Sequence, residues 1–234
     1  MTFSASAQAE FGSFDRRAQA GEALNVVFLG GSLTWGAQAT DPQLTSYRAL
    51  TSRRLAERYP AARFRFWDAA IGGTTSQLGA FRLERDVLAR KPDLVFLDFT
   101  VNDDPSIPPV ADRLASYEAI VRTLVSKGVP VVQAIFAVKR DVAANAKDRP
   151  LHVKHKEIAH AYGLPSGDAV ALMRAKVAAG EATAEALWDC PPDVTHPGDK
   201  GYALYAEAVW TAYEKAVAEK LVCRVPEAML HADT

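Results

Sequence analysis

The chain has 234 residues, of which 49% are hydrophobic, and its formal net charge is −1 at pH 7. A chain of this composition can bury a full core. It lacks the excess of basic residues expected of a nucleic-acid binder, so we expect no nucleic-acid partner. No run approaches the ~20 apolar residues that span a bilayer, and we therefore expect no membrane partner.

One domain is expected over residues 1–234, because α/β folds of this length are common as one unit. Residues 1–21 are expected to form an N-terminal extension of it. This segment has no continuous apolar region and carries charged side chains such as Glu10 and Arg16, so it is not a signal peptide. A cytoplasmic location is favoured, and secretion would require that a leader had been removed.

Apolar strand-like runs alternate with segments of helical period along the chain, which predicts parallel strands joined by crossover helices. In chain order the pattern predicts a strand over 24–29, a helix over 45–59, a strand over 64–67, a helix over 79–90, a strand over 94–99, a helix over 110–126, a strand over 130–136, a polar surface loop over 139–150, a helix over 151–162, a short strand near Leu164, and helices over 168–179 and 197–219.

The segment 110–126 carries the clearest helical pattern. Its apolar residues recur at spacings of three and four, which predicts an amphipathic helix with this stripe on the sheet: Val110, Leu114, Tyr117, Val121 and Leu124. The near-continuous apolar content of 94–99 instead favours a buried central strand.

Ser32 follows the first predicted strand, within the sequence Gly-Gly-Ser-Leu-Thr-Trp-Gly over 30–36. A strand that delivers a serine onto a glycine-flanked turn exposes the hydroxyl at the carboxyl edge of the sheet, where ligands bind in open α/β sheets. A serine needs a base and a group that orients the base before it can act as a nucleophile. Asp193 and His196 supply both on one short downstream segment.

Two further blocks lie between these segments, one with paired glycines over 69–76 and one over 100–103 that contains Asn102. The order of the four blocks resembles that of the SGNH hydrolases, also called the GDSL esterase/lipase family. Gly31 replaces the acidic residue usual before the serine, and Val101 stands where a glycine often precedes the asparagine. Neither change removes a group that the chemistry requires.

The resemblance implies a three-layer α/β/α sandwich of flavodoxin-like type with about five parallel strands. It also implies a catalytic triad in which Ser32 is the nucleophile, His196 the general base and then acid, and Asp193 the carboxylate that orients the imidazole. The oxyanion donors would be the backbone N–H groups of Ser32 and Gly73 and the side-chain amide of Asn102. No cofactor is implied.

Pro197 favours the first turn of a helix, which would place His196 at a helix N-terminus, where the macrodipole opposes an imidazolium. Asp193 would offset this penalty. Trp35 and Trp188 flank the serine and the histidine in sequence, and we expect both to line the acyl or sugar pocket.

The expected function is two-step ester hydrolysis through an acyl-serine, most favourably the removal of short O-acyl groups such as acetyl from a carbohydrate. Lipase, thioesterase or arylesterase activity on longer or aromatic acyl chains is the alternative among enzymes. A catalytically silent module that binds glycans is the alternative of another class.

Several residues have plainer interpretations. The glycine-rich turn alone would be an ordinary turn, and it lacks a phosphate-loop ending. His152 and His155 are expected on a solvated helix face. The acidic residues near the asparagine block lack a calcium-loop pattern, and we predict no metal; they are Asp98, Asp103 and Asp104. Asp103 is expected to have a structural role.

The two cysteines, Cys190 and Cys223, are too few for a disulfide framework and are expected to be free thiols. A homo-oligomer is compatible with the sequence, but no feature of the sequence supports one.

Overall fold

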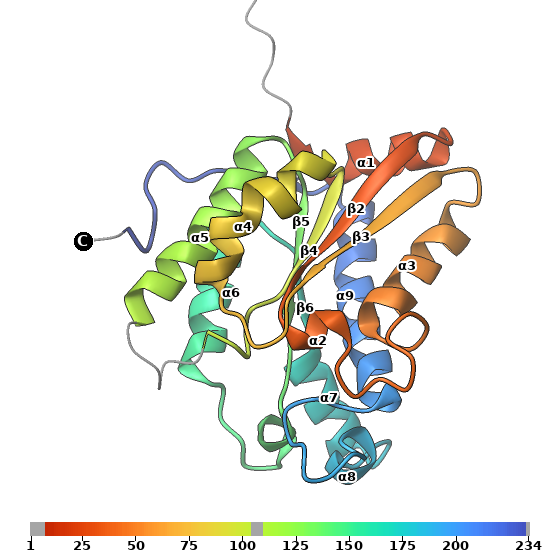
Figure 1. The fold of residues 1–234 in the computed structure, drawn as a ribbon, viewed down its shortest axis with the longest axis vertical. Helices are drawn as coiled ribbons and strands as arrows, with labels where there is room; N and C mark the ends of the chain where they lie inside the picture. Colours follow the sequence, from red (N-terminus) through yellow and green to blue (C-terminus); the bar gives the residue numbers. More distant parts are fainter. Residues whose placement is uncertain (1–7, 104–109, 233–234) are drawn as a thin grey trace, which may run out of the picture.

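The computed structural model describes residues 8–103 and 110–232. A five-stranded parallel sheet forms its centre, in the order β3-β2-β4-β5-β6 (Figure 1). The strands are β2 (Ala23–Gly30), β3 (Arg63–Ala70), β4 (Leu94–Leu97), β5 (Val131–Ile135) and β6 (Ser166–Asp168). Counted within this sheet alone the order is 2-1-3-4-5, the flavodoxin-like order, which confirms the predicted fold class.

The central strands are buried because helices cover both faces of the sheet. β4 and β5 are buried at every position, whereas β3, at the edge, consists of exposed and partly buried residues apart from the buried Ala69. β2 pairs with β3 from Ala23↔Arg63 to Gly30↔Ala70. Since the strands are parallel, their carboxyl ends meet at one edge, and the loops that follow β2, β3 and β4 are brought together there.

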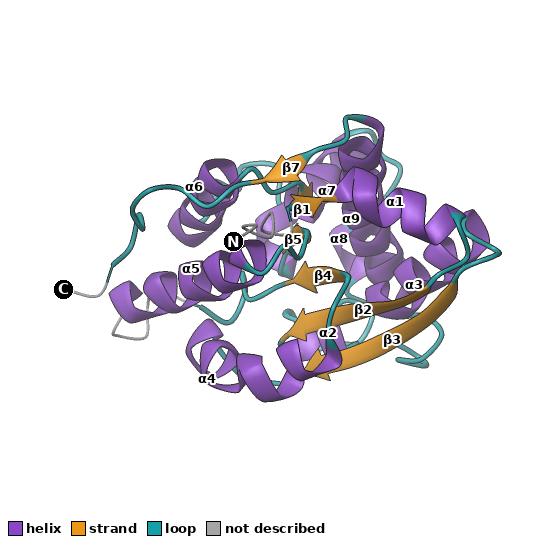
Figure 2. Cartoon of the chain, turned by 90° about the horizontal axis from the view of Figure 1, so that it is seen from above, coloured by secondary structure: helices purple, strands orange, loops and turns teal. Residues whose placement is uncertain are grey.

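The helices form two layers, seen on either side of the strands in Figures 1 and 2. α4, α5 and α6 cover one face, and α1, α3, α7 and α9 cover the other. Their bounds are α1 (Phe11–Gln19), α3 (Tyr47–Arg58), α4 (Ser76–Asp86), α5 (Val110–Ser126), α6 (Pro150–Tyr162), α7 (Ala169–Ala178) and α9 (Asp199–Ala218). Short helical turns complete the chain: α2 (Ser32–Trp35), α8 (Ala184–Leu187), η1 (Leu88–Arg90) and η2 (Lys139–Val142).

Aromatic side chains join the sheet to the α3 and α9 layer. The rings of Phe28 and Phe96, on neighbouring strands, stack with their centroids 4.9 Å apart. Phe136, just after β5, contacts the ring of Tyr47 in α3 at 4.7 Å and stacks on Tyr205 of α9 at 4.2 Å. Each such pair stabilises the fold by roughly 0.5–1.5 kcal/mol beyond the effect of burying its apolar surface. The loops at the carboxyl edge of the sheet are therefore attached to a tightly packed core.

The described part of the predicted N-terminal extension packs against the core. α1 buries Phe11 and Phe14 against the ring of Tyr213 in α9, at 6.3 and 6.1 Å. The preceding strand β1 (Ala9–Glu10) pairs antiparallel with β7 (Val222–Cys223). Phe11, Phe14 and Ala18, on one face of this short helix, therefore anchor the segment in the core. The pattern is too short to stand out in the sequence.

Other boundaries differ in detail. The helix predicted over 79–90 is divided between α4 and η1, and the last helix begins at Asp199 instead of residue 197. The predicted surface loop over 139–150 contains η2, in which Asp141 and Val142 are buried, so its expected exposure is wrong there. The buried stripe of α5 is confirmed at Leu114, Tyr117, Val121 and Leu124, while the side chain of Val110 lies outside the described residues.

Cys190 and Cys223 are free thiols, as expected. In the described part of the chain, no helix combines the length and the apolar character that a bilayer crossing requires.

Candidate active site

Ser32 begins α2, directly after the carboxyl end of β2. The turn that carries it requires glycine, because a Cβ on Gly30 would overlap the hydroxyl of Thr34 and approach the backbone oxygen of Asp98 to 2.6 Å. Gly36 ends α2 with φ of 100°, a conformation that side chains other than glycine rarely adopt. The sequence therefore folds into a fixed turn that presents the serine hydroxyl at the sheet edge.

Three side chains from two distant segments form one hydrogen-bonded chain. Ser32 Oγ lies 2.8 Å from His196 Nε2. On the other side of the ring, His196 Nδ1 lies 2.7 Å from Asp193 Oδ2. This is the geometry in which an imidazole takes the proton of a serine hydroxyl while a carboxylate fixes its tautomer. The structure thus brings the three predicted triad residues together.

Hydrogen bonds hold the Asp193 carboxylate in its charged form. Its Oδ1 accepts the backbone N–H groups of Thr195 at 2.8 Å and His196 at 3.0 Å. Burial raises the pKa of Asp193, but the hydrogen bonds from His196 and Thr195 outweigh it and lower the pKa to about 2. The carboxylate is therefore ionised at neutral pH and can stabilise an imidazolium. The prediction that Pro197 lies in the first turn of the last helix is wrong, because α9 begins at Asp199 after its N-cap, Gly198. His196 precedes this N-cap by two residues.

A loop from the nucleophile side also contacts this carboxylate. Gln38 donates from Nε2 to Asp193 Oδ2 at 3.3 Å, and its φ of 69° lies in the left-handed region. The loop is tied to the start of α9, where Asp199 Oδ1 accepts the N–H of Thr40 at 2.8 Å and the hydroxyl of Thr45 at 2.7 Å. No local sequence pattern indicates Gln38, because its partner lies 155 residues away.

The predicted oxyanion residues lie around the serine turn. A Cβ on Gly31 would lie 2.5 Å from Asn102 Oδ1, so the asparagine amide packs directly against the turn that carries Ser32. A Cβ on Gly72 would lie 3.7 Å from the Cβ of Ser32, which places the glycine loop beside the serine as well. Gly73, with φ of 69°, shares a cavity wall with Asn102. The donor roles of these groups stay a prediction.

Asp103 fastens the two loops that carry Gly73 and Asn102. Its buried carboxylate accepts the backbone N–H of Ser76 through Oδ1 at 2.8 Å, which confirms the expected structural role. His155 Nε2 lies 3.4 Å from Asp103 Oδ2, and the His155 ring stacks on Tyr117 at 3.9 Å.

The prediction that His152 and His155 lie on a solvated helix face is therefore wrong: both are buried. Helical spacing shows which residues share a face, but it does not show whether another element covers that face. Asp104 lies outside the described residues. Within 8–103 and 110–232, no group of three or more His, Cys, Asp or Glu side chains could hold a metal ion.

Asp98, the residue after β4, makes the stability of the native protein depend on pH. It is fully buried, and the N–H and hydroxyl of Thr100 both donate to Oδ1 at 3.0 Å. Burial raises the pKa of Asp98 to about 7. An aspartate in an unfolded chain titrates near about 4, so the native protein holds the extra proton between these values. Native stability therefore falls as the pH rises through this range, and the loss is complete above about 7.

We expect Asp98→Asn to remove this part of the pH dependence. The three pKa units correspond to at most about 4 kcal/mol in the free energy of unfolding. Urea denaturation between pH 4.5 and 8.5 measures the free energy of unfolding of the variant and of wild type. The contributions of the other titrating groups cancel in the difference between the two proteins. Parallel stability curves for the two proteins would show that Asp98 does not hold a proton in the native state.

The two tryptophans have different environments. Trp188 is 2% exposed, and its indole N–H donates to the backbone oxygen of Thr195 at 3.2 Å. The prediction that Trp188 lines the substrate pocket is wrong, because its ring packs in the core beneath the histidine loop. Trp35 is 47% exposed beside the serine, and its contact with substrate stays a prediction.

A cavity of about 760 Å³ opens next to the asparagine and glycine loops. Its walls come from the loops after β3, β4 and β5, from the start of α6 and α8, and from the histidine loop: Gly73, Thr75, Val101, Asn102, Val138, Lys139, Arg140, Ala143, Arg149, Ala184, Glu185, Val194 and Thr195. No signal in the sequence indicated Arg149 or Lys139, which lie in the segment expected to be a surface loop.

Comparison with solved structures shows which proteins the chain resembles. The chain is similar to a two-domain esterase active on acetylated mannans, with a TM-score of 0.76 and 30% identity over 94% of this chain and 56% of that chain. A second structure described in the same words has a TM-score of 0.74 and 32% identity over 88% of this chain and 52% of that chain. The chain thus spans about half the length of these esterases.

An acetylxylan esterase from Geobacillus stearothermophilus shares the fold, with a TM-score of 0.61 and 24% identity over 81% of this chain and 94% of that chain. Among curated proteins, none matches the chain. The model of the GDSL-like lipase/acylhydrolase family matches residues 28–204, from β2 to α9, and so includes every residue of the hydrogen-bonded chain from serine to aspartate. The chain therefore belongs to the GDSL-like lipase/acylhydrolase family of ester hydrolases and has the SGNH hydrolase fold.

Proposed function

We propose that the protein hydrolyses carboxylic esters through an acyl-serine intermediate and removes short O-acyl groups, above all acetyl, from a carbohydrate. The observation that carries the reaction is the hydrogen-bonded chain from Ser32 through His196 to Asp193. The substrate class is supported by the solved structures that are 30% and 32% identical, which are described as esterases active on acetylated mannans.

In the first step, Ser32 Oγ attacks the ester carbonyl carbon while His196 Nε2 takes the hydroxyl proton. The negative charge on the carbonyl oxygen is stabilised by hydrogen-bond donors of Ser32, Gly73 and Asn102. The tetrahedral intermediate then collapses: the bond between the carbonyl carbon and the sugar oxygen breaks, and the imidazolium returns its proton to that oxygen. Sugar alcohol leaves, and the acyl group remains on Ser32.

In the second step, water replaces the sugar. His196 removes a proton from the water as its oxygen attacks the acyl carbonyl, and the collapse of the second intermediate returns the proton to Ser32 Oγ. One ester and one water give one carboxylic acid and one alcohol, and the enzyme is restored. Asp193 stays ionised throughout, in agreement with the low pKa that its hydrogen bonds impose.

The proposal is tested with p-nitrophenyl acetate, butyrate and octanoate beside acetylated manno- and xylo-oligosaccharides. We expect kcat/KM to fall with acyl length and acetate to be released from at least one oligosaccharide. A preference for octanoate, or no release of acetate from any glycan, would favour the lipase-like or arylesterase alternative. No turnover, together with no labelling of Ser32 by a fluorophosphonate, would favour the silent glycan-binding module.

A further inference from the structure

Arg149, which is not part of the triad, lies in the wall of the cavity beside the asparagine loop. We propose that this cavity is the subsite for the neutral sugar part of the substrate, and that Arg149 is the side chain that selects it by donating to sugar hydroxyls. The inference rests on the proposed carbohydrate ester and adds where the sugar binds and which residue recognises it.

The position of the cavity places it on the leaving-group side of the serine. Its walls include Gly73 and Asn102 of the glycine and asparagine loops and Val194 and Thr195 of the histidine loop. His196 follows Thr195 directly and must protonate the departing oxygen, so the group attached to that oxygen lies beside this loop. A volume of about 760 Å³ falls within the roughly 300–1,000 Å³ of small-molecule sites, far more than an acetyl group fills.

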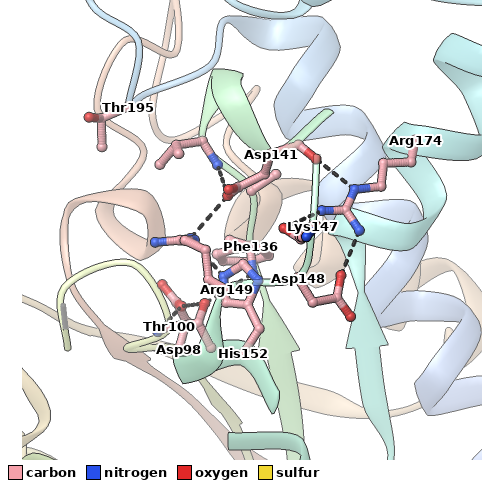
Figure 3. Close-up of polar contacts among 12 residues, drawn as sticks. Asp98, Thr100, Phe136, Asp141, Lys147, Asp148, Arg149, His152, Arg174 and Thr195 are labelled. Atoms are coloured by element: carbon pink, nitrogen blue, oxygen red, sulfur yellow. Dashed lines mark hydrogen bonds and ion pairs between the residues drawn. The ribbon is translucent and has the colours of Figure 1, made fainter. Parts of the chain in front are cut away.

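Arg149 is held in place before any substrate arrives. Its terminal nitrogen contacts Asp141 Oδ2 at 3.1 Å and His152 Nε2 at 2.6 Å, and its side chain is 14% exposed. Figure 3 shows the guanidinium extending from the start of α6 to Asp141, on the side of the network that faces Thr195. A donor fixed in this way loses little conformational freedom when it binds a ligand.

The partners of Arg149 are themselves fixed. Burial, followed by the charge of Arg149, lowers the pKa of His152 to about 2, so its ring stays neutral and can accept this hydrogen bond. Asp141 accepts the N–H of Val138 at 2.8 Å, and its backbone oxygen accepts Arg174 Nε at 2.6 Å. The network runs from η2 through α6 to α7 and leaves the orientation of the guanidinium little freedom.

The charges around the cavity suit a polyhydroxylated ligand. Arg149 is paired with Asp141, and Lys139, also in the cavity wall, lies 3.6 Å from Glu185. Paired charges offer both donors and acceptors, as sugar hydroxyls require, whereas a long acyl chain would bury them without hydrogen bonds at a cost in free energy. An anionic ligand would meet Glu185 as well as the cations. Val138 and Val194 supply apolar surface for the C–H faces of a sugar ring.

The test compares Arg149→Met and Arg149→Lys with wild type on an acetylated manno-oligosaccharide and on p-nitrophenyl acetate, whose leaving group is a single aromatic ring. We expect Arg149→Met to raise KM for the oligosaccharide about tenfold, as for loss of one charge-assisted hydrogen bond, and to lower kcat/KM on p-nitrophenyl acetate several-fold less. Arg149→Lys, which keeps the charge opposite Asp141, should give an intermediate KM.

Binding without turnover supplies a second readout. In the Ser32→Ala background, calorimetry should show about tenfold weaker binding of the acetylated oligosaccharide when Arg149 is also replaced by methionine. Arg17→Met is the matched control, because it also removes an ion pair between an arginine and an aspartate. One terminal nitrogen of Arg17 lies 2.6 Å from Asp93 Oδ1, and Asp93 directly precedes β4, at the end of the strand opposite the catalytic loops. It should leave KM unchanged.

The outcomes separate this inference from the proposed function. If wild type releases acetate from the glycan and Arg149→Met leaves KM and binding unchanged, the subsite is wrong and the proposed function stands. Equal losses on both substrates would assign Arg149 to support of the catalytic loops. If wild type cleaves only p-nitrophenyl esters, the carbohydrate substrate fails and the sugar subsite fails with it. Preference for an acidic acetylated glycan over a neutral one would also overturn the neutral-sugar assignment.

Discussion

Replacement of Ser32 by alanine is expected to lower kcat on p-nitrophenyl acetate by about 10⁴-fold or more and to abolish the acyl-enzyme. The reason is geometric: Ser32 Oγ is the atom that His196 Nε2 contacts at 2.8 Å, and alanine leaves the imidazole without a nucleophile to activate. Stopped-flow kinetics would measure the loss of turnover. Mass spectrometry after treatment with a fluorophosphonate would measure the loss of the covalent adduct.

Ser52→Ala is a suitable control for this variant. Ser52 lies in α3 and donates its hydroxyl to the backbone oxygen of Arg48, away from the triad. We expect its kinetics to match wild type. Turnover by Ser32→Ala above about a tenth of the wild-type rate, at an unchanged melting temperature, would mean that another group attacks the ester.

Replacement of Asn102 by alanine is expected to lower kcat about 100-fold to 1,000-fold with little change in KM, since an oxyanion donor acts mainly in the transition state. The amide of Asn102 packs against Gly31 in the serine turn, and in the proposed mechanism it donates to the carbonyl oxygen of the substrate as that oxygen becomes negative. Asn102→Asp, with nearly the same shape, replaces the donor by a charged acceptor and should be at least as impaired. Steady-state kinetics on p-nitrophenyl acetate measure both variants.

Asn25→Ala controls for the general effect of losing an asparagine amide. Asn25 lies in β2 and accepts the indole N–H of Trp67 at 3.0 Å, far along the strand from the serine. We expect it to lower the melting temperature without lowering kcat. If Asn102→Ala instead raised KM and kept kcat, the amide would bind the ground state of the substrate and would not be an oxyanion donor.

Much of the fold could be predicted from the sequence because its signals are local. The bounds of α5 agree with the predicted 110–126, since an apolar stripe of helical period and a terminal glycine mark it. The central strands were predictable because strands covered on both faces have continuous apolar runs. The contribution of α1 to the core could not be predicted, because the partner of Phe11 and Phe14 is Tyr213, about 200 residues away.

The site divides in the same way. Ser32, Asn102 and His196 lie in short blocks whose order resembles that of the SGNH hydrolases, so they could be predicted as site residues from that resemblance. Trp188 lies close to the histidine in sequence, yet the structure turns its ring into the core. Proximity along the chain does not decide the direction of a side chain, because packing against distant elements does.

By itself, then, the sequence determined the alternation of parallel strands and helices, since hydrophobic period is a property of neighbouring residues. Its short motifs, through their resemblance to the SGNH hydrolases, implied the fold class and the residues of the proposed triad. Only the tertiary structure decided the burial of His155, the contact of Gln38 with Asp193, and the place of Arg149 in a cavity wall. Each of these depends on two or more segments meeting in space. The free energy of those contacts arises from packing and desolvation, which no single segment contains.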